Sequence, residues 1–145
     1  MATSVLRESM ATACSTGLLY FLAVFTFAFA MGVARELVVA PWLGSTAAVL
    51  LEIPVILVAS WIVAHRLLRH RSLTLMERAA MGVTAFTLTM ASEAAFSMLL
   101  RVQSVTDWAA AVATPLGLVG LVGQIVFATI PIFVNPGRID TAPTV

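Results

Sequence analysis

Charged side chains within strongly apolar sequence are the residues whose types and spacing could carry chemistry in this chain. Arg35 and Glu36 lie near the end of one apolar run, Glu52 lies inside a second, and Glu93 lies inside a third that ends at Arg101. A charge at the centre of a bilayer costs roughly 2.5 to 3.5 kcal/mol on insertion scales, so such residues usually face a protein interior, a partner or a polar cavity. We therefore expect these five side chains to form one intramembrane cluster.

The elements that must position this cluster are membrane-spanning helices. Of the 145 residues, 61% are hydrophobic and 10% are charged, and the mean hydropathy is +1.03. A span needs about 20 apolar residues, so this length allows four spans and short connections. The sequence predicts an all-α, antiparallel four-helix bundle that forms a single transmembrane domain over residues 1–145, with spans at about 13–40, 45–64, 79–100 and 108–134.

The arginines are distributed unevenly between the two ends of these predicted spans. Two of them, Arg35 and Arg101, fall on one side, and six fall on the other: Arg7, Arg66, Arg69, Arg71, Arg78 and Arg138. Positively charged residues concentrate on the cytoplasmic side of membrane proteins. We therefore expect cytoplasmic N and C termini. The formal net charge of +1 gives no indication of a nucleic-acid partner.

The predicted depths of the two internal acids are similar. Glu52 lies seven residues into the second span and Glu93 lies eight residues before Arg101, which places them about 10 and 12 Å from the outer helix ends at 1.5 Å per residue. Side chains lean toward a helix N-terminus, so Arg35 and Arg101, at the outer C-terminal ends of their helices, lean toward the depth of the two acids. A spacing of four residues puts a polar stripe on one face of the third helix: Thr89, Glu93, Ser97 and Arg101.

Small residues on the fourth helix are expected to allow close helix approach, since glycine lets backbones meet in membranes. They form a face that ends in the amide of Gln124, and they comprise Ala113, Gly117 and Gly120. We expect Gln124 to make a hydrogen bond between helices more readily than a ligand contact. The chain's phenylalanines and methionines are interpreted as core or lipid-facing residues.

Three functional interpretations stay open. Three acids against two arginines leave one negative charge, so either one glutamate is protonated or the site accepts a cation, and the cluster would bind or move a small cationic or amphiphilic ligand or a proton. Alternatively, the charges only neutralise one another, and the chain is an accessory or assembly subunit of a membrane complex. A third interpretation is a membrane enzyme acting on a lipid or isoprenoid, with one glutamate as general acid or base.

The sequence provides no second catalytic signature, so we assign no catalytic residue and favour a protein that is not an enzyme. Cys14 is the only cysteine, which excludes an internal disulfide and a multi-cysteine metal site. His65 and His70 flank arginines and are interpreted as solvated side chains. We predict no metal and no cofactor. The expected partners are membrane lipids, a small amphiphilic ligand, and a membrane protein or a second copy of the chain.

A residue pattern spread over most of the chain comprises Gly32-x-x-Arg35, Pro41-x-x-Gly44, Glu52-x-Pro54, Trp61, Met81-Gly82, Glu93 and Thr114-Pro115-x-Gly117-x-x-Gly120-Leu121-x-Gly123-Gln124. In this pattern the chain resembles a group of small four-span bacterial inner-membrane proteins with no assigned activity. The resemblance implies a multi-pass protein of the cell inner membrane. Glu52-x-Pro54 in a four-helix membrane protein is also similar to the sterol-isomerase and sigma-2-receptor superfamily, whose acids bind cationic ligands or move protons.

Overall fold

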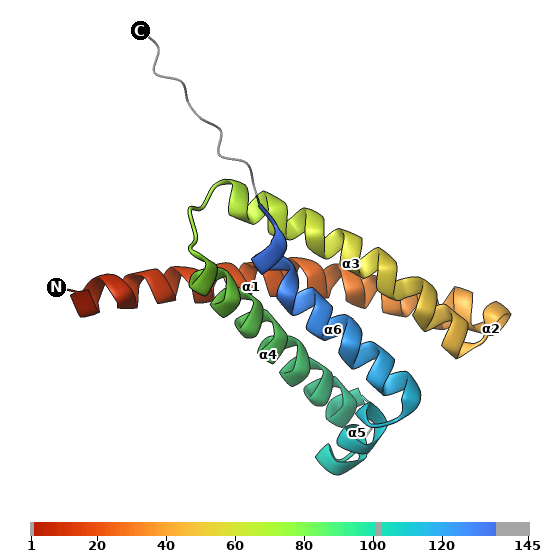
Figure 1. Cartoon of the computed structure of the whole chain (residues 1–145). Coiled ribbons are helices and arrows are strands. Elements are labelled where there is room, and N and C mark those ends of the chain that lie inside the picture. The colour runs from red at the N-terminus through yellow and green to blue at the C-terminus, as the bar shows by residue number, and fades with distance from the viewer. Residues whose placement is uncertain (1, 101–102, 136–145) are drawn as a thin grey trace, which may run out of the picture.

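The computed structural model describes residues 2–100 and 103–135, with side chains from residue 7 onward, and this part of the chain is all-α. Four long helices dominate it: α1 (Ala2–Ala34), α3 (Ser45–Arg69), α4 (Leu75–Leu100) and α6 (Pro115–Phe133). α1 continues through a π-helical turn, η1 (Arg35–Val39), into the short α2 (Ala40–Leu43), and α5 (Val105–Val112) precedes α6 (Figure 1).

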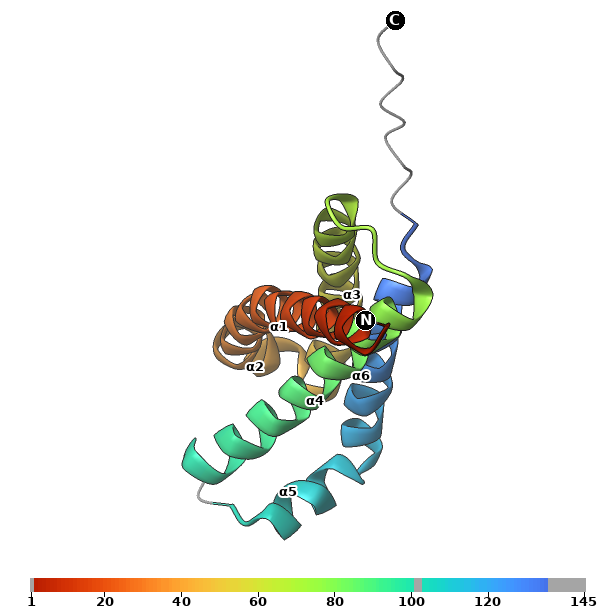
Figure 2. The same ribbon diagram turned by 90° about the vertical axis from the view of Figure 1, so that its left-hand side faces the viewer.

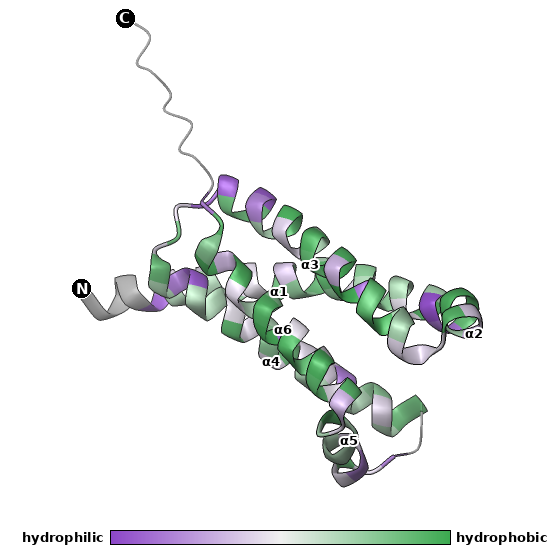
Figure 3. Cartoon of the chain, turned by 45° about the vertical axis from the view of Figure 1, so that its right-hand side comes forward, coloured by the Kyte–Doolittle hydropathy of each residue, from purple (hydrophilic) through white to green (hydrophobic). Residues whose placement is uncertain are grey.

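The four long helices are long and apolar enough to cross a membrane, with candidate spans at Arg7–Leu43, Ser45–Arg69, Leu75–Leu100 and Pro115–Phe133. Large apolar side chains are exposed along them, for example Leu99, Val58 and Trp42. Hydrophobic residues cover the length of these helices, whereas hydrophilic residues gather toward the helix ends (Figure 3). Helices that are apolar all round are typical of membrane spans, so the chain is a multi-pass membrane protein.

The long helices form a ring in which each contacts two neighbours. α1 packs against α3 and α4, and α6 packs against the same two helices, so that α3 lies diagonally opposite α4 across the ring (Figures 1 and 2). Toward the ends that carry α2 and α5, the α1–α3 pair diverges from the α4–α6 pair (Figures 1 and 3). The bundle is therefore closed at one end and splayed at the other.

The closed end is held by small residues and by one buried tyrosine. Gly17 of α1 lies against the backbone of Met81, and Gly82 of α4 lies against the carbonyl of Ala128, so neither site has room for a β-carbon. The hydroxyl of Tyr20 donates to the carbonyl of Phe127 at 3.1 Å, and the two rings stack with centroids 4.7 Å apart. Glycine thus brings α1 to α4 and α4 to α6, as expected for helices in lipid.

Arg71, in the connection between α3 and α4, and Arg78, near the start of α4, bind other parts of the chain. Arg78 donates to the carbonyls of Leu73 (3.0 Å) and Val134 (2.8 Å), which ties the start of α4 to the end of α6. Arg71 donates to the hydroxyl of Thr16 on α1 at 2.5 Å. Two of the arginines predicted on the cytoplasmic side therefore form hydrogen bonds that hold helices together.

The region expected to form one helix over residues 108–134 is two helices. Thr114 is extended and its hydroxyl accepts from the amide of Gly117 at 3.1 Å, so α6 begins at Pro115. Proline suits the first turn of a helix because its missing N–H would have no partner there. Trp108 accordingly lies on α5, whose N-terminus is capped by Ser104 and Asp107.

Candidate functional site

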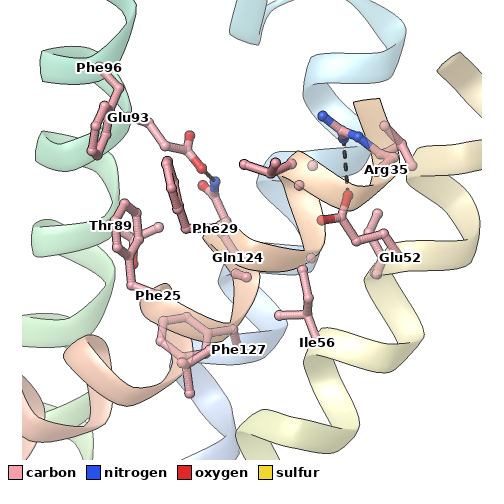
Figure 4. A pocket seen from close by; sticks show the side chains of 18 of the residues that line it. Phe25, Phe29, Arg35, Glu52, Ile56, Thr89, Glu93, Phe96, Gln124 and Phe127 are labelled. Carbon is pink, nitrogen blue, oxygen red and sulfur yellow. Dashed lines mark hydrogen bonds and ion pairs between the residues drawn. The ribbon is translucent and has the colours of Figure 1, made fainter. Parts of the chain in front are cut away.

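The splayed end of the ring contains a cavity of about 670 Å³ lined by side chains from all four long helices. It extends to Arg35 and Glu36 on η1 and to Trp108 on α5. Most of its wall is apolar, and four phenylalanines contribute to it: Phe25, Phe29, Phe96 and Phe127 (Figure 4). Pockets for small molecules in proteins typically measure about 300 to 1,000 Å³ and are mainly apolar with a few polar groups. This cavity has that size and character.

One side of the cavity carries an ion pair. Nη1 of Arg35 lies 3.1 Å from Oε2 of Glu52 on α3, and the exposed fractions of the two side chains are 23% and 10% (Figure 4). The second guanidinium nitrogen, Nη2, donates to Oε1 of Glu36 at 2.8 Å, and the Glu36 side chain is 56% exposed. Arg35 therefore satisfies the buried Glu52 and also has a partner toward the surface.

A second polar pair lies on the α4–α6 side of the cavity. Nε2 of Gln124 donates to Oε1 of Glu93, while Oε1 of Gln124 is buried without a hydrogen-bond partner in the described part of the chain (Figure 4). Glu93 forms no ion pair with any described residue. Thr89 and Ser97, one turn away on either side, also line the cavity, which confirms the predicted polar face of α4 over the described residues.

The sequence predicted a single charge cluster, and the structure divides it into two. Glu52 pairs with Arg35, whereas Glu93 pairs with a neutral amide across the cavity (Figure 4). The physical reason is the order of helices in the ring, because α3 and α4 are diagonal and their acids face each other across the cavity. Five of the six predicted residues line this cavity, and Arg101 lies outside the described residues.

The glycines of α6 do not share one role. A methyl group added at Gly120 would meet no heavy atom within 4 Å, so this glycine opens onto the cavity instead of packing against a helix. Gly117 lies against the carbonyls of Ala111 and Val112 at the end of α5. The prediction of a continuous close-packing glycine face is therefore wrong at Gly120, although Gln124 does make the predicted hydrogen bond between helices.

The sequence interpretation, which treats the phenylalanines as core or lipid-facing residues, does not identify the aromatic part of the cavity wall. Phe96 of α4 lies against Phe25 and Phe29 of α1, with ring centroids 6.0 and 5.6 Å apart. Phe21 precedes Phe25 by one turn and their ring centroids are 5.0 Å apart. The spacing of four between Phe21, Phe25 and Phe29 is the signal that could have identified this face of α1.

No known protein family, curated protein or solved structure matches the chain. The charged wall residues of the cavity are one arginine and three glutamates: Arg35, Glu36, Glu52 and Glu93. A cation is therefore favoured over an anion inside it.

Proposed function

We propose that this chain is a multi-pass protein of the bacterial inner membrane whose cavity binds a small amphiphilic cation. The observation that carries the proposal is the environment of Glu93. Its carboxylate lines a largely apolar cavity and is held by the neutral amide of Gln124, without a cationic partner among the described residues. A charge at this depth is costly unless it is paired. A bound cation would supply that partner.

The Arg35–Glu52 pair has a different role in this proposal. Its atoms are 3.1 Å apart and it links η1 to α3, so it neutralises both groups within the protein. We assign it to holding the two helices in register at the mouth of the cavity. The structural and the functional interpretations of the charged residues thus apply to different acids, with Glu52 structural and Glu93 ligand-binding.

The apolar wall accounts for the amphiphilic character of the ligand. Phe25, Phe29 and Phe96 form one contiguous aromatic surface, and Gly120 leaves space opposite the side chains of other helices. A hydrocarbon body would gain about 25 cal/mol for each Å² of apolar surface removed from water. Aromatic faces also attract cations, by about 0.5 to 2 kcal/mol at close range. A cationic head on an apolar tail satisfies both features.

The proposed orientation places both termini in the cytoplasm. Four of the chain's eight arginines lie between residues 66 and 78, at the connection of α3 to α4, and they support that side as cytoplasmic. The resemblance to small four-span bacterial proteins supports the inner membrane as the location. The end of the bundle at which η1 and α5 line the cavity then faces the opposite, outer side.

Binding of dodecylamine, which is protonated to an alkylammonium ion at neutral pH, tests the proposal. We expect saturable binding, at one site per chain, to the protein in zwitterionic lipid nanodiscs, and no saturable binding of dodecanoate, the matched anion. Gly120→Phe should abolish binding by filling the cavity, since the space at Gly120 is open. Val122→Phe, on the same helix but exposed and outside the cavity wall, is the matched control and should still bind.

Two results would contradict the proposed function. One is uptake of dodecylamine by the protein-containing nanodiscs that equals uptake by empty nanodiscs. The other is equal binding by the parent and by Gly120→Phe, which would place any bound amine outside the cavity.

A further inference from the structure

The hydrogen bond between Gln124 and Glu93 is compatible with either charge state of the acid. We propose that Glu93 is an exchange site, at which the empty cavity holds a proton on Oε2 and a bound amphiphilic cation replaces that proton. Binding of one cation then releases one proton. This inference rests on the proposed function and adds a second ion, H⁺, that competes for the same carboxyl group.

The bond from Gln124 occupies only one oxygen of Glu93. Nε2 of Gln124 donates to Oε1 of Glu93 (Figure 4). Oε2 of Glu93 makes no hydrogen bond or ion pair with a described residue, and yet, unlike Oε1 of Gln124, it is not a fully buried atom. Glu93 also lines the cavity. Oε2 is therefore the atom at which either a proton or a cation can be added.

An amide partner permits both charge states, whereas an arginine partner does not. A carboxyl group that is protonated on Oε2 still accepts at Oε1, so the NH₂ group of Gln124 stays in place whether Glu93 is neutral or ionised. Arg35 is always cationic and lies 3.1 Å from Glu52, so a proton added to Glu52 would break that ion pair. Glu93 can therefore change its charge without losing a contact within the described structure.

The other charged groups that face the cavity supply no cation to Glu93. Arg35 and Glu36 of η1 pair with each other at 2.8 Å, and Arg35 also pairs with Glu52 of α3. The described wall residues of α1, α5 and α6 are uncharged, and Glu93 is the one charged residue among those of α4. A carboxylate without a cation in apolar surroundings is costly, and either a proton or a cation removes that cost. Each alone neutralises Glu93, so one excludes the other.

Binding of dodecylamine at a series of pH values tests the inference on the parent protein. Between about pH 5 and 8 the amine stays protonated, because an alkylammonium group loses its proton near the lysine value of about 10.4. We expect the apparent Kd in zwitterionic nanodiscs to fall as pH rises, by up to about tenfold per pH unit, the limit for exchange of one proton, and to level off where Glu93 is already ionised. At the acid end, in weak buffer with an indicator dye, binding should release up to one proton per amine.

Glu36→Gln and Glu52→Gln are the matched control variants, because each removes one carboxyl group from the cavity wall and leaves Glu93 in place. Both should keep the proton release of the parent, and Glu93→Gln should release no proton. Proton release that persists in Glu93→Gln, or that disappears in either control variant, would overturn the inference.

Two results on the parent protein separate this inference from the proposed function. Saturable binding with the same affinity at every pH, or without proton release at the acid end, would overturn the exchange site and leave the proposed function in place. Absence of saturable dodecylamine binding at every pH would instead overturn the proposed function, and this inference with it.

Discussion

Removing Arg35 should destabilise the protein much more than removing the charge of its partner Glu52. At 3.1 Å the two charges attract by about 5 kcal/mol at an effective dielectric constant of 20, before the cost of desolvation is subtracted. Breaking a buried pair by removing one partner typically costs about 3 to 5 kcal/mol, because the other charge is left uncompensated. Arg35→Met keeps the apolar stem and leaves Glu52, whose side chain is 10% exposed, in that situation.

Removing the charge of Glu52 instead leaves Arg35, which has a second partner. In Glu52→Gln, Arg35 retains Glu36 at 2.8 Å, and its side chain is 23% exposed. We therefore expect a cost of about 1 to 2 kcal/mol, similar to a lost hydrogen bond with a charged group. The double variant removes both charges and should cost less than Arg35→Met alone, which corresponds to a coupling energy larger than the cost of Glu52→Gln, that is, more than about 1 to 2 kcal/mol.

Reversible unfolding in mixed detergent micelles, followed by helicity, measures all four proteins of this double-mutant cycle. Arg66→Met is the matched control, because Arg66 is exposed near the end of α3 and makes no hydrogen bond within the described residues; its effect should stay within about 0.5 kcal/mol. A cost of Glu52→Gln that equals or exceeds that of Arg35→Met would refute the asymmetry. A coupling energy near zero would show that the pair does not hold η1 to α3.

Three further predictions concern packing and capping. Gly82→Ala should lower the unfolding free energy relative to Gly120→Ala by about 1 to 3 kcal/mol. Both variants gain helix propensity, but only Gly82→Ala forces a methyl group against the carbonyl of Ala128. Equal unfolding free energies in the same micelle assay would contradict this packing. Arg78→Met should cost about 1 to 3 kcal/mol by leaving the carbonyls of Leu73 and Val134 without their donor, and a cost as small as that of Arg66→Met would refute the clamp. Hydrogen bonds from Ser104 hold the pKa of Asp107 below its usual range. The capping contribution of Asp107 is therefore present above the unfolded pKa of about 3.9 and is lost as pH falls through the lower folded value. Amide exchange of α5 should show this loss in the parent, and the control variant Asp107→Asn should not show it.

The fold was largely predictable because lipid imposes simple rules on a chain. Runs of about 20 apolar residues are typical of membrane spans, and the spacing of four from Thr89 to Ser97 correctly assigned one face of α4 to the cavity. The break before Pro115 was also encoded, since Thr114 and Pro115 are favourable cap and first-turn residues. That signal was outweighed by the apolar character of the residues on both sides.

The division of the charges between two sites could not be read from residue spacing. Depth along each helix placed Glu52 and Glu93 in the same layer, but the order of helices around the ring decides whether side chains in one layer meet, and sequence periodicity does not contain that order. Gly120 shows the same limit. A glycine in a membrane helix permits either close backbone approach or an open cavity, and only the position of the neighbouring helix distinguishes the two.

The affinity of dodecylamine for two isosteric variants tests the central claim most directly. Glu93→Gln and Glu52→Gln each remove one negative charge from the same cavity, and both leave the side-chain volume nearly unchanged. We predict that Glu93→Gln weakens binding in nanodiscs by at least about tenfold, the loss of a charge-assisted hydrogen bond, whereas Glu52→Gln stays within about threefold of the parent. Weakened binding in Glu52→Gln together with parental affinity in Glu93→Gln would contradict the assignment of Glu93 as the ligand-binding acid.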